Sequence, residues 1–162
     1  MEIETPARAE QPVNVGALSS DGTRSAAGSN AGEFYLLSPE ATKMWTRTTD
    51  GPLNDVSVSL NGARTAEGTV SGSVYTVNSQ GVVIKQMSHP ETLITSLAIN
   101  SSGSKLIAGT AYGRVFAFNS QVTMTWEMFI GGSVTSVALT LSGNKIDASS
   151  GNTVNLLSGD GP

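Results

Sequence analysis

The chain has 162 residues, with nine Lys and Arg against 13 Asp and Glu, a formal net charge of −4 and no cysteine. This acidic balance, with cations scattered singly, argues against nucleic acid and anionic membrane surfaces as partners, and the lack of cysteine excludes disulfides and thiolate metal sites. No apolar run is long enough to span a bilayer, and Met1 to Thr5 lack the features of a signal peptide, so membrane insertion is not expected and the compartment stays unknown.

Residues 1–12 form an N-terminal arm that precedes the repeating part of the chain. The arm contains Pro6 and Pro12, and its segment Glu2-Ile3-Glu4-Thr5 alternates polar and apolar residues. Alternation of this kind is typical of a strand with one buried face. We therefore expect an edge strand inside the arm.

The rest of the chain repeats at a nearly constant step. The anchoring glycines are Gly22, Gly62, Gly103 and Gly143, which are 40, 41 and 40 residues apart. A fixed step of this size indicates a repeat architecture. It divides residues 13–162 into units 13–52, 53–92, 93–133 and 134–162.

Each unit reads as short strands separated by turn residues, without an amphipathic helical stretch. The first three units each predict four strands and the last predicts three. The predicted strands are 13–19, 24–29, 33–37 and 43–47; 56–60, 64–69, 73–77 and 82–86; 97–100, 105–110, 114–118 and 123–128; and 137–141, 145–149 and 153–157.

Equivalent positions in the units carry equivalent residues. The sixth position after each anchoring glycine is small, the third strand carries an aromatic, and two of three fourth strands carry tryptophan. These sets are Gly28, Gly68, Gly109 and Ser149; Tyr35, Tyr75 and Phe116; and Trp45, Lys85 and Trp126. Sheets with small residues on both faces must stack to bury them, which predicts an all-β β-propeller, with a β-solenoid as the competing geometry.

The segments 136–145 and 108–119, together with the fourth-strand tryptophans, resemble quinoprotein-like and WD-type propeller repeats of prokaryotic surface proteins. The resemblance covers residues 13–162, although Trp45 is followed by Thr46 where WD repeats have Asp. It implies a propeller in an extracellular or cell-surface assembly. Quinoprotein enzymes also need cofactor and calcium ligands on one face of a complete ring, and no such acidic cluster is evident, so we expect no cofactor.

One cation follows each anchoring glycine by two residues. These cations are Arg24, Arg64, Lys105 and Lys145. In a closed ring they would lie at one level and could form an anion-binding collar. The alternative is that each is a solvated cation at the rim, where a long charged side chain discourages edge pairing.

The opposite end of each unit offers a second candidate site. Its chemically varied stretches include His89, Glu91 and Tyr112, which could form a binding face. His89 with Glu91 could also act as a base and its orienting partner. No nucleophile accompanies them, so we expect turn residues rather than catalytic ones.

The function expected from these observations is a non-enzymatic interaction or structural module. The alternatives are a fragment of a quinoprotein-like dehydrogenase and a lectin-like binder of carbohydrate. Short, regular connections favour the first, because elaborated sites occupy long or irregular loops. Other proteins or glycans are possible partners besides a second copy of the chain.

The last unit predicts only three strands, which leaves an edge with unpaired backbone groups. We expect the arm strand, Glu2 to Thr5, to complete it. Because small residues suit a gentle turn between units, we expect two chains to exchange these strands in an eight-bladed ring. An open head-to-tail assembly, a self-closed four-bladed ring and a fragment of a longer protein are the alternatives.

Overall fold

The computed structural model describes residues 8–90 and 92–161. Within this part of the chain the secondary structure consists of strands and turns, and no helix is present that could cross a membrane. Fifteen strands form four antiparallel sheets. The all-β prediction and the division into four sheets of three or four strands are therefore confirmed.

Strands that follow one another in sequence are neighbours in each sheet. The first sheet is β1 (Val13–Leu18), β2 (Ser25–Ser29), β3 (Glu33–Leu37) and β4 (Lys43–Thr48). The second is β5 (Leu53–Val58), β6 (Arg64–Thr69), β7 (Ser73–Asn78) and β8 (Val83–Ser88). The third is β9 (Ile94–Ile99), β10 (Leu106–Thr110), β11 (Arg114–Phe118) and β12 (Met124–Phe129). The fourth is β13 (Val134–Leu139), β14 (Lys145–Ser150) and β15 (Thr153–Ser158).

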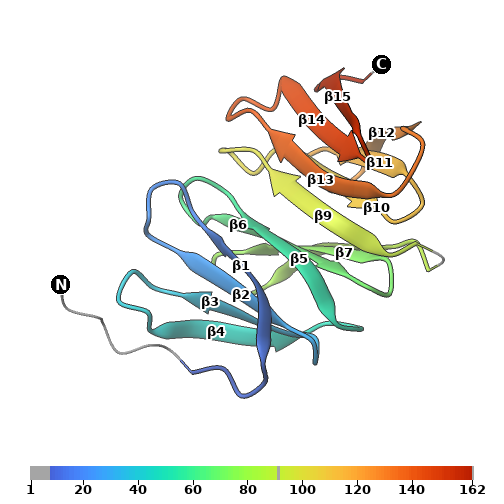
Figure 1. Ribbon diagram of the computed structural model, residues 1–162. Coiled ribbons are helices and arrows are strands. Elements are labelled where there is room, and N and C mark those ends of the chain that lie inside the picture. Colours follow the sequence, from blue (N-terminus) through green and yellow to red (C-terminus); the bar gives the residue numbers. More distant parts are fainter. Residues whose placement is uncertain (1–7, 91, 162) are drawn as a thin grey trace.

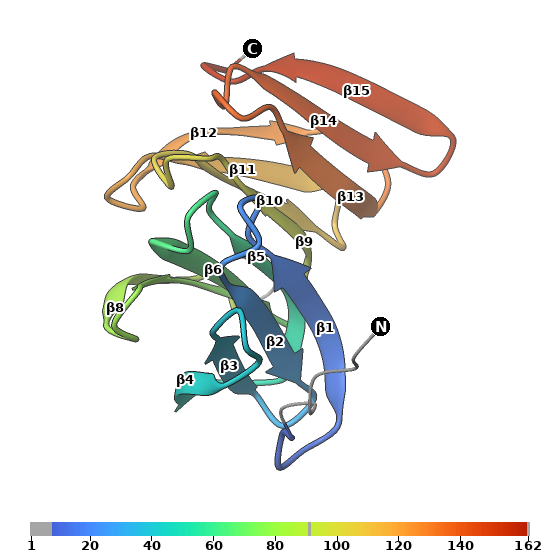
Figure 2. The same cartoon turned by 90° about the vertical axis from the view of Figure 1, so that its left-hand side faces the viewer.

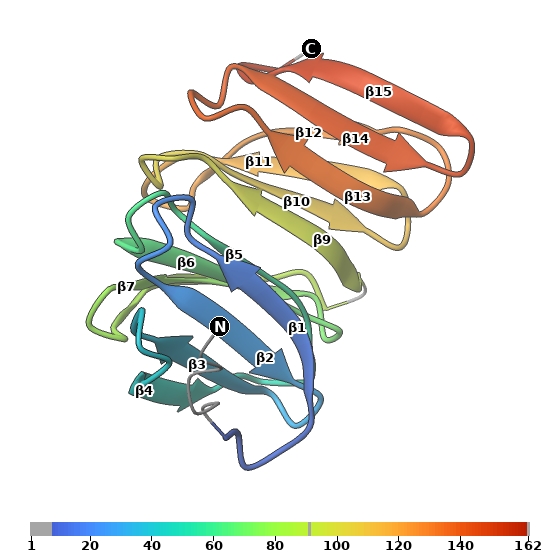
Figure 3. The ribbon, with the colours of Figure 1, turned by 60° about the vertical axis from the view of Figure 1, so that its left-hand side comes forward.

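The sheets stack face to face in a curved row, with the first strands β1, β5, β9 and β13 side by side (Figure 1). The first and fourth sheets lie at opposite ends of this row (Figures 2 and 3). The arrangement is consistent with the blades of a β-propeller, but the structure does not show a closed ring. The arm strand predicted at residues 2–5 lies outside the described residues.

The first strands of the last three units begin three residues earlier than predicted, at Leu53, Ile94 and Val134. The pairing between first and second strands shifts register near these starts, as at Leu53/Asp55. A bulge inserts one extra residue and breaks the two-residue alternation of side chains. The alternation therefore revealed only the part of each strand that follows the bulge.

The core lies at the boundaries between sheets, where three clusters of buried apolar side chains separate consecutive units. Gly28, Gly68 and Gly109 face the first strand of the following unit. A Cβ atom at Gly68 would lie 2.6 Å from Cγ2 of Ile94. The packed sheets therefore leave no room for a side chain at these three positions. Every boundary thus depends on one small residue opposite a branched apolar one.

Candidate functional site

The proposed collar cations lie across the boundaries between units. Arg64 packs its side chain over Gly103 of the following unit, and its guanidinium donates hydrogen bonds to the carbonyls of Gly103 (3.3 Å) and Ser120 (2.5 Å). Lys105 donates to the carbonyl of Gly159 at 2.7 Å. These groups are half-buried and bonded to protein, so they differ from the solvated rim cations considered above.

The other two cations belong to the first and last units of the row. Arg24 packs over Gly62, as Arg64 does over Gly103, although its guanidinium donates locally to the carbonyl of Thr23 at 2.5 Å. Lys145, in the last unit, is exposed, and its ammonium group has no hydrogen-bond partner among the described residues. Arg24, Arg64 and Lys105 therefore lie over a glycine of the following unit, whereas Lys145 is exposed.

The fourth-strand tryptophans also reach across boundaries. Trp45 lies on Gly81 and donates from Nε1 to the carbonyl of Ser79 at 3.1 Å. Trp126 makes the equivalent contacts with Gly161 and the carbonyl of Gly159, at 3.4 Å. The carbonyls of Ser79 and Gly159 are equivalent to that of Ser120. Arg64 donates to the Ser120 carbonyl at the boundary between the second and third units. The tryptophans thus serve packing between units.

A buried ion pair joins the first and second units and was not predicted. Arg47 on β4 donates to the carboxylate of Glu67 on β6, whose side chain is fully buried. Burial raises the pKa of Glu67 to about 7 against the opposing effect of Arg47. The equivalent residues in the other units are Ala27, Ala108 and Ala148. This break in the repeat is the sequence signal that could have revealed the pair.

Tyr75 packs against Arg47 of this ion pair. Its ring lies beneath Arg47, with the guanidinium carbon 4.6 Å from the ring centroid. Its hydroxyl accepts a hydrogen bond from the Asp50 amide at 3.3 Å and from Gln86 at 3.0 Å. Burial raises the pKa of Tyr75. These contacts link the first sheet to the second, while the other carboxylate oxygen of Glu67, Oε1, is buried without a hydrogen-bond partner among the described residues.

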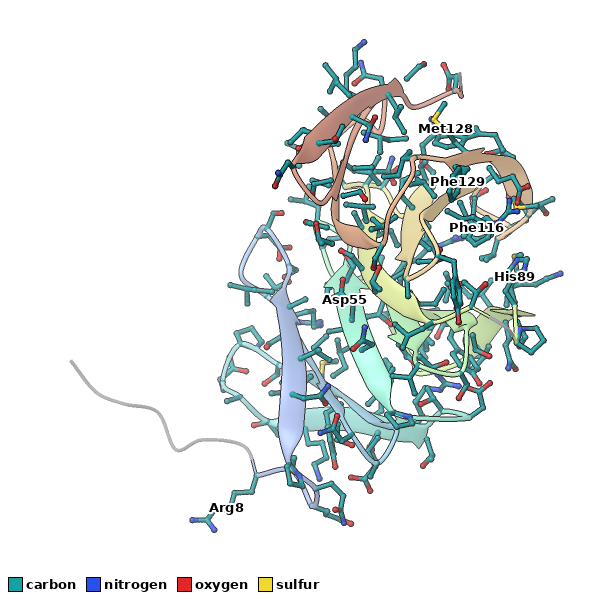
Figure 4. The ribbon with its side chains drawn as sticks, turned by 45° about the vertical axis from the view of Figure 1, so that its right-hand side comes forward. Arg8, Asp55, His89, Phe116, Met128 and Phe129 are labelled. Atoms are coloured by element: carbon teal, nitrogen blue, oxygen red, sulfur yellow. The ribbon has the colours of Figure 1, made fainter. Side chains whose placement is uncertain are left out.

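The candidate binding face is only partly brought together. His89 stacks on Phe116 of the third unit, with ring centroids 4.7 Å apart and an interplanar angle of 7° (Figure 4). Its Nε2 atom is buried without a hydrogen-bond partner among the described residues. Tyr112 is exposed, and no hydrogen bond within the described chain joins it to His89. Glu91, the third candidate, lies outside the described residues.

The two ends of the row are the most distinctive surfaces. On the fourth unit, Val154 and Leu156 of β15 are 68% and 73% exposed. Their register partners on β14 are Ser149 and Asp147, which face away from the third unit. A hollow on this face is lined by Ala138, Lys145, Asp147 and Leu156, among others. We call this surface the trailing face.

The first unit presents the opposite surface, which we call the leading face. It includes Val13, Ala27, Tyr35, Leu37 and Lys43, which line a hollow together with residues Arg8 and Ala9. Val13 is 50% exposed, whereas its equivalents Leu53, Ile94 and Val134 are buried. Arg8 lies at this end of the row (Figure 4). The leading face is thus the counterpart of the surface that each later unit presents to the unit before it.

The segment before β1 repeats a contact found inside the row. The Glu10 amide donates to the Tyr35 hydroxyl at 3.3 Å, as the Asp50 amide donates to the Tyr75 hydroxyl at 3.3 Å. Both members of the second pair lie 40 residues after those of the first. Asp50 belongs to the connection between the first and second units. Glu10 therefore holds the position of a connection that enters the first unit.

Neither the family models nor the curated proteins with which the sequence was compared give a match. Among the described residues no group of three or more His, Asp or Glu side chains is placed to hold a metal ion. The geometry thus offers two end faces that no other unit of the described chain covers, and a set of polar groups that bind across the boundaries between units.

Proposed function

We propose that this chain is a non-enzymatic β-propeller module of an assembly, in which the N-terminal strand of one chain completes the last blade of another. The resemblance to repeats of prokaryotic surface proteins supports an extracellular or cell-surface assembly. The polar side chains that recur between units support a structural role, because Arg64, Lys105 and Trp126 all bind carbonyls of the following unit. A two-chain ring of eight blades and an open head-to-tail row are both compatible with this exchange.

The contact between Glu10 and Tyr35 carries the proposal. In the first blade boundary, the same contact is made by the connection that follows the fourth strand β4. The spacing of 40 residues that relates the two contacts also relates Lys43 to Ile3 and Thr48 to Arg8. By this register, the arm holds the sequence position of a fourth strand followed by its connection.

The last blade lacks a fourth strand among the described residues. In the first three sheets the third strand pairs with a fourth, whereas β15 pairs only with β14 among the described residues. An unpaired edge exposes backbone donors and acceptors and favours the addition of another strand. The arm of a second chain has the register to add there, and the same exchange repeated by the partner closes a ring.

Light scattering on the full chain tests the proposal directly. We expect a mass of two or more copies of the 16.7 kDa chain. Deleting residues 1–12 should weaken the assembly, so that it forms only at higher protein concentration, and replacing Glu2 to Thr5 with Gly and Ser at unchanged length should do the same. A full chain that stays monomeric over the accessible concentration range contradicts the proposal.

A second measurement addresses the absence of enzymatic function. Addition of pyrroloquinoline quinone and calcium should leave the melting temperature of the full chain unchanged. A concentration-dependent rise would instead favour the dehydrogenase fragment. Specific retention on a glycan array would favour the carbohydrate binder.

A further inference from the structure

We infer that the trailing face of one chain docks on the leading face of a second copy and forms a boundary of the same kind as the three inside the chain. This inference rests on the proposed function and deepens it. The proposed exchange concerns the edge strand β15, whereas this docking concerns the faces of two sheets. The two contacts can therefore be disrupted separately.

The trailing face carries apolar positions that are buried in every other unit. The equivalents of Val154 are Phe34, Val74 and Val115, and those of Leu156 are Leu36, Thr76 and Ala117. All six are at most 2% exposed. Val154 and Leu156 are more than two-thirds exposed at the same places. Burying two such side chains removes apolar surface from water and so stabilises a contact.

The leading face exposes an apolar position that is buried in the other units. Leu53, Ile94 and Val134 each lie against a small residue of the preceding unit, and each is at most 1% exposed. Val13 holds the equivalent position and is half exposed, because no other unit of the described chain packs on it. On the trailing face, Ser149 occupies the small-residue position. Val13 of a second copy can therefore pack on Ser149, as Val134 packs on Gly109.

One cation and one glycine of the repeat also lack the contact with each other's kind that the other units make within the described chain. Inside the chain, Arg24, Arg64 and Lys105 lie on Gly62, Gly103 and Gly143 of the next unit. Lys145 is the fourth cation, and it is exposed. Gly22 is the fourth glycine, and no heavy atom lies within 4 Å of the position of a Cβ there. Docking places Lys145 of one copy over Gly22 of the other.

Backbone hydrogen bonds between the first turns of consecutive units form a further repeated contact. The Leu60 amide donates to the carbonyl of Ser101, and the Ser101 amide donates to that of Leu141, each at 3.1 Å. The equivalent amide of the last unit is that of Leu141, and the equivalent carbonyl of the first is that of Ser20. Docking therefore joins the Leu141 amide of one copy to the Ser20 carbonyl of the next.

Charge further specifies the partner. Asp147 stands on the trailing face where the other units have Ala26, Ala66 and Ile107. An isolated carboxylate there would be costly to bury against an apolar surface. The hollow of the leading face is bordered by Arg8 and Lys43. These opposite charges favour trailing-to-leading contact over a pairing of two like faces.

Single substitutions of exposed residues test the docking without disturbing the fold. Leu156→Asp and Val13→Asp each place a charge at a position exposed in the isolated chain. We expect both variants to keep the circular dichroism spectrum of the wild type. Each should lose one of the two docking faces, which reduces assembly by light scattering. Val82→Asp is the matched control, because Val82 is 58% exposed but belongs to neither face.

Mixing the two variants tests the direction of docking. Leu156→Asp retains an intact leading face and Val13→Asp retains an intact trailing face. On the background of the Gly and Ser replacement of residues 2–5, each variant alone should be monomeric. An equimolar mixture should form a dimer through the one intact pair of faces. A mixture that stays monomeric, while the parent replacement chain still associates at the same concentration, overturns the head-to-tail arrangement.

The outcomes separate the docking from the proposed function. A wild-type assembly that Leu156→Asp and Val13→Asp leave intact, but that is lost on deletion of residues 1–12, overturns the docking and retains strand exchange. A wild-type chain that is monomeric throughout contradicts both. Loss of assembly in Val82→Asp as well would show that any surface charge disrupts it, and would also overturn the docking.

Discussion

Trp45 of the first unit lies on Gly81 of the second, and a Cβ atom at that glycine would be 2.9 Å from the indole ring. Trp126 and Gly161 repeat this relationship between the third and fourth units. At the intervening boundary both members differ, since Lys85 replaces the tryptophan and Val122 replaces the glycine. Val122 has a φ of 55°, in the left-handed region that glycine favours, and its side chain is buried. The residue on the fourth strand and the residue beneath it thus vary together.

This covariation within the chain predicts coupling between Lys85 and Val122. Val122→Gly should lower the free energy of unfolding, because the loss of a buried valine, about 1.5–3 kcal/mol, exceeds the relief of left-handed strain, about 1 kcal/mol or more. Adding Lys85→Trp should recover much of the loss by restoring the pair found at the other boundaries. Lys85→Trp alone should not stabilise. Additive effects in urea unfolding would contradict the coupling.

Gly68→Ala should destabilise the chain by about 1–3 kcal/mol, because the added methyl group overpacks against Ile94. Gly16→Ala is the matched control. Gly16 is also a strand glycine, but a Cβ there lies 3.5 Å from the nearest atom, an ordinary contact. The control should be neutral or slightly stabilising, since glycine weakens a strand. Equal melting temperatures for the two variants would show that the boundary does not require a small residue.

Arg64→Ser should lower the free energy of unfolding by about 1–3 kcal/mol, because two carbonyls lose a charged donor and Gly103 loses its cover. Lys145→Ser makes the same kind of change at the equivalent position of the last unit. It should have little effect on the stability of the isolated chain. We would measure both by thermal unfolding at low protein concentration. Similar losses of unfolding free energy in both variants would mean that the contribution of the cation does not depend on contact with a following unit.

Removing one member of the Arg47 and Glu67 pair should be more costly than removing both. Glu67→Ala leaves a buried guanidinium without its carboxylate, and Arg47→Met leaves a buried carboxylate, at a cost of about 3–5 kcal/mol. The double variant matches the next boundary, where Met87 and Ala108 are equivalent. It should be near the wild type in stability, or above it. A double variant that is less stable than either single variant would contradict this.

Stability should also depend on the protonation of Glu67. Its pKa is raised to about 7 in the folded chain from 4.5, so the folded state holds more protons between these values and stability falls as pH rises. The contribution is complete below pH 4.5 and is lost above about pH 7. The difference in unfolding free energy between the wild type and Glu67→Gln should fall by at most about 3 kcal/mol over this range. A difference that is constant with pH would rule out the raised pKa.

The repeat made most of the fold predictable. Four anchoring glycines and their equivalent small and aromatic residues indicated stacked sheets, because each unit had to bury two faces. Strand starts at Leu53 and Ile94 were missed, since bulges interrupt the alternation there. The spacing therefore located the turns better than the alternation located the strands.

The candidate site was less predictable. The cations were recognised as a series, but their partners required knowledge of which face meets which. Arg64, for example, binds a carbonyl 56 residues later. Glu67 was not predicted, because its signal is only a departure from the alanine at the equivalent positions, and its partner Arg47 is 20 residues away on another sheet. Contacts across a boundary depend on how two units are placed, which the spacing within one unit does not specify.

The main contacts between sheets join consecutive units along the row. The two inner units therefore have neighbours on both faces, whereas each outer unit has one neighbour within the chain. In such a linear array, stability is the sum of the units and their nearest-neighbour terms. Unfolding can then begin at either end and stop at the next boundary, so the outer sheets form the least cooperative part of the molecule. A partner at each end would extend cooperative folding beyond a single polypeptide.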